Sequence, residues 1–255
     1  MSEKSEIVEA ETAPEPKPRW RELVLYLVVG FGLYILASIP LLLFVGGDFS
    51  EISIGVTAAI GILNALCLVG TVYLTGVRRG KISWAGLGFI PPSIKAEWIF
   101  VAVLISLVLI PVRAFLGAAA EWMVSGSLDS LQMRSDVLFA GAEPTMLNFL
   151  VSLLIIAVLV PISEELYFRG LLYRWFRLRF RLWPAVLLSS LLFGLAHYDS
   201  LAVVISSFVL GVVNALAMER TKSIWVPIVM HAVTNGVAVA VMYAFLVWDQ
   251  FGPLA

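Results

Sequence analysis

Charged residues are scarce in this sequence. Only 14% of its 255 residues are charged, whereas 60% are hydrophobic. Because soluble globular domains contain about 25% charged residues, this composition excludes an ordinary water-soluble enzyme. The formal net charge is only -1. Without an excess of basic residues, we expect no nucleic-acid partner.

Cysteine and histidine are rarer still. Cys67 is the only cysteine in the sequence, which excludes a disulfide framework and a metal site built from paired thiolates. The only two histidines are His197 and His231. Any chemistry that needs an imidazole must therefore use one of these two side chains.

Long uncharged apolar runs make up most of the chain. Seven are present, at residues 23–45, 52–77, 98–112, 144–163, 182–198, 200–218 and 223–248. A helix that crosses a bilayer needs about 20 such residues, and five of the runs have 19 or more. The third run can also be extended through Arg113 to Ala120. We therefore predict an all-α, polytopic membrane bundle of seven or eight transmembrane helices.

The segments outside these runs set the predicted domain boundaries. Residues 1–21 are rich in Glu, Lys and Pro, a composition that favours a disordered tail. Residues 22–249 form the predicted transmembrane domain, and residues 250–255 form a second short tail. If the N-terminus is cytoplasmic, every Lys and Arg except Arg113 and Arg134 falls on the cytoplasmic side. The positive-inside rule thus predicts a multi-pass cell-membrane protein with a cytoplasmic N-terminus, embedded in the lipid bilayer.

A few polar residues lie inside the apolar runs, where ionisable side chains usually mark a functional interior. The fourth run leads into Glu164 and Glu165, and the fifth carries His197. If these runs form an antiparallel hairpin that turns near residues 180–181, Glu164 and His197 are equally far from the turn. Residues at equal distances from such a turn lie side by side, so we expect this pair to be in contact within the membrane.

Helical spacing indicates how the other polar residues are arranged. Glu165 and Arg169 are four residues apart, so they can pair and leave Glu164, on another face, free for chemistry. In the seventh run His231 and Asn235 share one face for the same reason. We predict that these residues line an intramembrane cavity between the fourth to seventh spans.

Three motifs, in this order, resemble the CAAX protease and bacteriocin-processing (CPBP) family. They are Glu164-Glu165-x-x-x-Arg169, Phe193-x-x-x-His197 and His231-x-x-x-Asn235. The resemblance covers residues 144–240 and uses every histidine of the chain. It implies an intramembrane endopeptidase that hydrolyses peptide bonds with an activated water and whose cavity faces the cytoplasm. The implied partner is a peptide or protein substrate at the membrane, and a prenylated (CAAX-type) C-terminus is one candidate.

The resemblance also implies a role for each matched residue. Glu164 would be the general base and His197 would hold the attacking water, while His231 and Asn235 would donate to the oxyanion. The supporting residues would be Glu165, Arg169 and Phe193. Asn214, in the sixth run, is the only candidate for a further polar position of the family pattern, and we expect it to form an interhelical hydrogen bond.

Other functions use the same residues. Zinc could be bound by Glu164, His197 and His231, but the sequence lacks the motif that places two histidines on one helical turn with a glutamate between them. We therefore expect no metal cofactor. A non-catalytic bacteriocin-immunity or scaffold protein of the same fold is a second alternative. A proton-coupled transporter, with Glu164 and His197 as the relay, is a third.

Overall fold

The computed structural model describes residues 17–45, 54–90, 96–129, 144–198 and 200–252, and every regular element in these ranges is a helix. The predicted all-α class is therefore confirmed. In chain order the elements are α1 (Trp20–Val45), α2 (Ile54–Thr71), η2 (Val72–Val77), α3 (Ala96–Ser125), α5 (Met146–Ser152), η3 (Leu153–Leu159), α6 (Val160–Glu165), η4 (Leu166–Tyr173), α7 (Arg174–Arg179), α8 (Leu182–Leu195), α9 (Leu201–Thr221) and α10 (Trp225–Phe251).

Five helical segments in the described ranges are long and apolar enough to cross a membrane. They are Ile54–Val77, Glu97–Ser125, Met146–Arg179, Leu201–Thr221 and Trp225–Phe251. Helices suit this environment because their backbone polar groups are satisfied within the segment. The chain is thus a multi-pass membrane protein. Helix α8 is apolar but shorter, with 14 residues, and the total of seven or eight spans stays a prediction.

The ends of the helical domain differ slightly from the predicted boundaries. Helix α1 begins at Trp20 and α10 continues to Phe251, beyond the predicted range of 22–249 at both ends. The backbone oxygen of Arg19 accepts a hydrogen bond from Trp175 Nε1 at 3.3 Å, so the chain just before α1 contacts α7. Most of the predicted N-terminal tail lies outside the described residues, as does much of the C-terminal tail.

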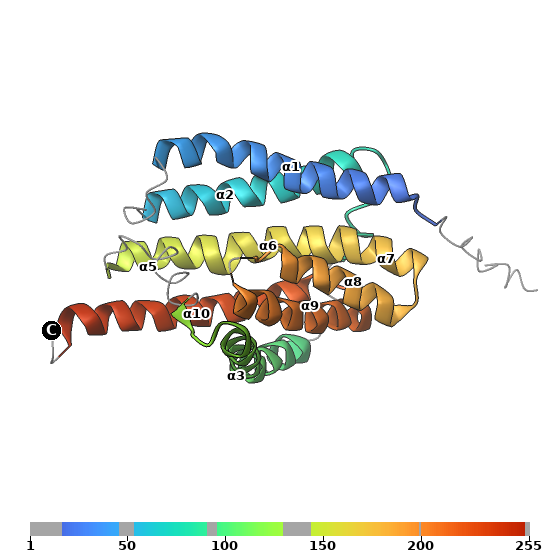
Figure 1. Ribbon diagram of the computed structural model, residues 1–255. Helices are drawn as coiled ribbons and strands as arrows, with labels where there is room; N and C mark the ends of the chain where they lie inside the picture. Colours follow the sequence, from blue (N-terminus) through green and yellow to red (C-terminus); the bar gives the residue numbers. More distant parts are fainter. Residues whose placement is uncertain (1–16, 46–53, 91–95, 130–143, 199, 253–255) are drawn as a thin grey trace, which may run out of the picture.

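The helices form a layered bundle (Figure 1). Helices α1 and α2 lie side by side at the top of the view, and the long rod from α5 to α7 runs beneath them. Helices α8, α9 and α10 pack on the other side of this rod, and α3 packs on α9 and α10. The rod that carries Glu164 is therefore in the interior of the bundle.

The predicted hairpin between the fourth and fifth runs is confirmed. Helix α7 ends at Arg179, Phe180 is extended, and α8 begins at Leu182. Helix α8 then packs closely on α9. A Cβ atom added to Gly211 would lie 3.0 Å from the Cα atom of Ser190, so a larger residue would push these helices apart. The hairpin and the close α8–α9 contact hold the end of α8, and with it His197, beside the central rod.

The basic segments gather at one end of the bundle. Arg177 and Lys222 each form an ion pair of 3.1 Å with Glu219. Arg174 Nη1 donates to the backbone oxygen of Gly86 at 3.1 Å. These contacts join three segments that we predict to be cytoplasmic. The orientation of this end with respect to the membrane stays a prediction.

Candidate active site

The central rod is not a regular α-helix. Its segments η3 and η4 are π-helical and flank the short α-helical stretch α6, which ends in Glu164 and Glu165. Such π-helical segments are rare and frequently occur at functional sites. In η3 the backbone oxygen of Ile156 accepts a hydrogen bond from Asn235 Nδ2 at 2.9 Å. The irregular rod thus holds the predicted oxyanion donor with its own backbone.

Glu164 lies between the two histidines. Its Oε2 atom is 3.7 Å from His197 Nε2 and 3.8 Å from His231 Nε2. Glu164 is only 7% exposed, and its buried Oε2 atom has no hydrogen-bond partner in the described part of the chain. The predicted contact between Glu164 and His197 is therefore present, but at a distance longer than the usual hydrogen bond of about 2.7–3.2 Å.

The ring of His197, which lies in the turn after α8, is oriented by the backbone of that helix. Its Nδ1 atom is 2.8 Å from the carbonyl oxygen of Phe193, the residue four positions earlier. Because a carbonyl oxygen can only accept, Nδ1 carries the proton in this contact. In the neutral imidazole Nε2 then has a lone pair, and this lone pair is on the side of Glu164.

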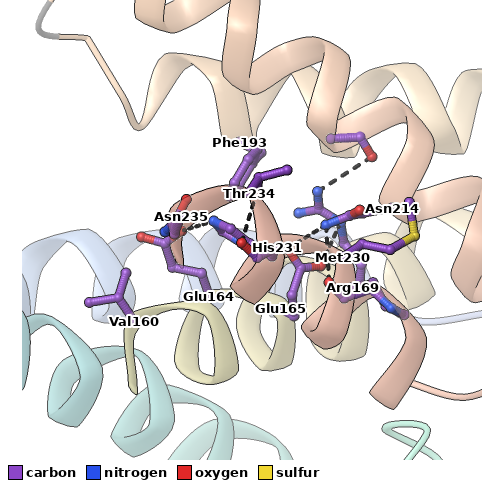
Figure 2. A network of polar contacts seen from close by, with 12 residues as sticks. Val160, Glu164, Glu165, Arg169, Phe193, Asn214, Met230, His231, Thr234 and Asn235 are labelled. Atoms are coloured by element: carbon purple, nitrogen blue, oxygen red, sulfur yellow. Dashed lines mark hydrogen bonds and ion pairs between the residues drawn. The ribbon is translucent and has the colours of Figure 1, made fainter. Parts of the chain in front are cut away.

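The ring of His231 is oriented by Glu165. Its Nδ1 atom is 2.9 Å from Glu165 Oε1, so the carboxylate accepts the Nδ1 proton. Figure 2 shows His231 between two groups, with Glu164 and Asn235 on one side and the Glu165 network on the other. His231 is 3% exposed. The Nε2 atom of His231 thus faces Glu164, while the Glu165 carboxylate accepts a hydrogen bond from Nδ1 on the opposite side of the ring.

Glu165 is the centre of a buried polar network. Arg169 Nε forms an ion pair with Glu165 Oε2 at 3.1 Å, and both side chains are almost fully buried. Asn214 Nδ2 donates to Glu165 Oε1 at 3.0 Å. The expected i,i+4 pair and the expected interhelical hydrogen bond of Asn214 are therefore both present. Full burial distinguishes this ion pair from a salt bridge at the membrane surface.

Phe193 packs at the point where these groups meet. The Arg169 guanidinium lies 4.4 Å from the centre of its ring. The rings of His197 and His231 are 4.7 Å and 5.6 Å from it. Phe193 is fully buried, and its ring packs against the guanidinium and both imidazoles.

A cavity of about 970 Å³ adjoins these residues, and Glu164, His197, His231 and Asn235 all line it. Its size is at the upper end of the range of small-molecule pockets, about 300–1,000 Å³. The cavity is wider than the sequence suggested, because α1, α2 and α3 also line it. In α3 and α9 the lining residues lie in the half of the helix away from the basic end. The predicted opening toward the cytoplasm stays a prediction.

The first three spans contribute polar residues to this cavity that were not predicted from the sequence. They are Tyr34, Thr57, Asn64 and Arg113. A signal was present for Arg113, since it is a charged residue next to a long apolar run, and a charge within a membrane helix usually has a function. The other three residues are common in membrane helices, and nothing in the local sequence distinguishes them.

The residues around Glu164 meet some of the requirements of a zinc site. The donor types and the two imidazole tautomers suit this metal. Tetrahedral zinc sites hold ligand atoms about 2.0–2.1 Å from the metal and therefore about 3.3 Å apart, whereas the donors here are 3.7 and 3.8 Å apart. No group of three or more His, Cys, Asp or Glu side chains in the described ranges has the geometry of a metal site. Zinc binding would need a small inward movement of these side chains.

The fold and the site define a helical membrane protein with a buried glutamate, two imidazoles and an asparagine around one cavity. Residues 146–237 match the family model described as type II CAAX prenyl endopeptidase Rce1-like. The resemblance that the three motifs indicate is therefore confirmed over this segment. The match includes Glu164, His197, His231 and Asn235, all of which line the cavity.

Two bacterial proteins are similar to this chain. An uncharacterized 24.3 kDa protein of Escherichia coli is 32% identical over 94 residues, which cover 35% of this chain and 43% of that protein. YdiL of Bacillus subtilis (strain 168), provisionally named a membrane peptidase, is 25% identical over 233 residues, or 86% of each chain. No solved structure matches the chain significantly. Together the family model and YdiL support an intramembrane protease.

Proposed function

We propose that this chain is an intramembrane endopeptidase in which Glu164 and His197 activate a water to attack a peptide bond. The observation that carries the proposal is the position of Glu164 Oε2. This buried atom lacks a hydrogen-bond partner in the described part of the chain, yet it faces both imidazole Nε2 atoms across gaps of 3.7 and 3.8 Å. A water molecule between these groups can donate one hydrogen bond to Glu164 Oε2 and the other to His197 Nε2.

The proposed reaction begins with this water. It donates one proton toward the Glu164 carboxylate and the other toward the lone pair of His197 Nε2. As the water oxygen attacks the carbonyl carbon, Glu164 takes a proton and negative charge develops on the carbonyl oxygen. When the C–N bond breaks, Glu164 returns the proton to the leaving amine. No acyl-enzyme intermediate is needed.

His231 and Asn235 are the proposed donors to the oxyanion. Because His231 Nδ1 already donates to Glu165 at 2.9 Å, its Nε2 atom can donate only when the imidazole is charged. The buried Glu165 carboxylate would stabilise that charge. Asn235 uses one amide proton for the Ile156 oxygen and has a second one to offer. Preorganised donors of this kind are effective where water is excluded.

The role of Asn235 can be tested by Asn235→Ala. Losing one oxyanion donor should lower kcat by about 10²–10³-fold, with little change in peptide affinity, because the donor acts mainly in the transition state. Thr234→Val is a suitable control on the same helix, since Thr234 Oγ1 donates to the backbone oxygen of His231 and is not among the residues that line the cavity. An unchanged kcat in Asn235→Ala would contradict this role.

The proposed activity itself is tested with purified protein in lipid vesicles. A prenylated C-terminal peptide and its unprenylated counterpart are incubated with the protein, and the products are identified by mass spectrometry. We expect wild-type protein to produce a defined cut that is absent with Glu164→Gln. If the protein binds these peptides but cuts none of them, the non-catalytic scaffold function is favoured instead.

A zinc-dependent form of the same protease is the second candidate function. The observation that favours it is the tautomer of both histidines, since each Nδ1 atom donates to an oxygen and each Nε2 atom is directed toward Glu164. Supporting contacts of this type are typical of metal-binding histidines. Glu164, His197 and His231 would hold the metal, which would make the bound water more acidic and polarise the carbonyl group.

Metal removal distinguishes the two forms. We expect cleavage by purified protein to be unchanged, within about twofold, after dialysis against a chelator, because in the proposed reaction Glu164 is the base. Metal content measured by elemental analysis on the same sample is the control. Activity that is lost with the metal and restored by added zinc would contradict the metal-free mechanism and support the second candidate.

A further inference from the structure

We propose that Arg113 binds a carboxylate group of the peptide substrate and so makes a negative charge near the cleaved bond a requirement for efficient cleavage. This inference rests on the proposed function and assigns part of its specificity. Arg113 is outside the three sequence motifs and outside the segment that matches the family model. It nevertheless lines the same cavity as Glu164 and His197.

The position of Arg113 is fixed by close contact between α3 and α9. One turn along α3, a Cβ atom added to Gly117 would lie 2.6 Å from the backbone oxygen of Ala202, so the two backbones almost touch there. Arg113 Nε donates to the backbone oxygen of Ser206 at 2.8 Å. This hydrogen bond holds the base of the guanidinium against α9 and leaves its outer nitrogens available to the cavity.

The charge of Arg113 is not neutralised by the residues that the structure describes. No described carboxylate lies within ion-pair distance of it, and its Nη1 and Nη2 atoms have no hydrogen-bond acceptor in those ranges. Arg169, the other arginine beside the cavity, has Glu165 as its partner at 3.1 Å. Charged residues within membrane helices normally pair or face a functional cavity. A ligand in the cavity is therefore the expected partner of Arg113.

The shape of the free group indicates the ligand. Two guanidinium nitrogens in one plane match the two oxygens of a carboxylate. Glu164 carries the opposite charge in the same cavity and would repel a carboxylate, so the anionic end of a peptide should lie toward Arg113. The carboxylate can belong to the C-terminus of the substrate or to an Asp or Glu side chain. Only the first source would place the cut near the end of the substrate.

Three synthetic peptides, of which the first two have the same sequence, test this inference. The first has a free C-terminal carboxylate, the second has a C-terminal amide, and the third has the amide together with one internal Asp. For wild-type protein in vesicles, we expect kcat/KM for the amide to be about 10–100-fold lower than for the acid, the usual effect of one charged hydrogen bond. If the third peptide recovers this loss, the carboxylate comes from a side chain.

Arg113→Gln should remove the preference by lowering the rate for the acid and leaving the rate for the amide almost unchanged. Arg113→Lys should keep part of the preference, since it retains the charge. Arg220→Gln is the matched control, because Arg220 is an exposed residue of α9 that is absent from the cavity wall. Wild-type protein that cuts all three peptides equally, or Arg113→Gln that slows all three equally, would overturn the inference.

The failure of this inference can be separated from failure of the proposed function. Affinities of all three peptides are also measured with Glu164→Gln, which needs no cleavage. Tighter binding of a peptide with a carboxylate that disappears in Glu164→Gln/Arg113→Gln supports the carboxylate site even if no peptide is cut. Equal affinities for all three peptides overturn the site even if wild-type protein proves to be a protease. If Arg113→Gln does not fold, the comparison of the three peptides with wild-type protein still decides.

Discussion

Glu164→Gln is expected to reduce kcat for peptide cleavage by about 10²–10⁴-fold, the usual contribution of a general base. The amide has nearly the shape of the carboxyl group but cannot take a proton from water. Peptide affinity should change little, because Glu164 acts on the water and not on the ground-state peptide. The measurement is single-turnover cleavage by purified protein in vesicles, together with the affinity of the same peptide.

A control for this substitution is Glu97→Gln. Glu97 is an exposed residue in the first turn of α3 and is absent from the cavity wall. The Glu97→Gln variant should cleave the peptide at the wild-type rate. If Glu164→Gln also cleaved at the wild-type rate, Glu164 would not be the base. A loss of affinity without loss of single-turnover rate would assign Glu164 to substrate binding.

Arg169→Met is expected to cause the largest loss of stability. Arg169 and Glu165 are both fully buried, and removing one charge leaves the other without its closest opposite charge. Breaking a buried ion pair in this way destabilises proteins by about 3–5 kcal/mol. The stacking of the guanidinium on Phe193 would be lost as well. The measurement is reversible unfolding in mixed detergent micelles compared with wild-type protein.

The double variant Glu165→Gln/Arg169→Met separates stability from catalysis. Because both charges are removed, its free energy of unfolding should be closer to that of wild type than the free energy of unfolding of Arg169→Met is. Its kcat should stay low, since a neutral amide at position 165 cannot stabilise a charged His231. Wild-type stability in Arg169→Met would contradict the structural role of the pair. Wild-type activity in the double variant would contradict the electrostatic role of Glu165.

Much of the candidate site could be predicted from the sequence, because its residues follow from simple helix geometry. The chain turns tightly between Arg179 and Leu182. Residues at equal distances before and after this turn therefore lie at the same depth, and Glu164 and His197 are such a pair. The pair of Glu165 and Arg169 follows from their spacing of four residues. Both contacts can be predicted from the length of an apolar run, the spacing along a helix and the position of one turn.

Other contacts depend on how distant helices are rotated and packed, which no local pattern records. The hydrogen bond from His231 to Glu165, and not to the adjacent Glu164, is set by the rotation of α10 against the central rod. The π-helical segments that present the Ile156 oxygen were not predicted for the same reason. The part of the cavity wall formed by Asn64 and Arg113 arises from packing between spans far apart in sequence.

The central claim is that Glu164, His197 and His231 surround one peptide bond within the membrane. An experimental structure of Glu164→Gln with a bound peptide tests it most directly. The account predicts that the scissile carbonyl carbon lies next to the side chain at position 164, with its oxygen within hydrogen-bond distance of His231 Nε2 and Asn235 Nδ2. A peptide bound elsewhere, or histidines that face lipid or packed apolar side chains, would contradict it.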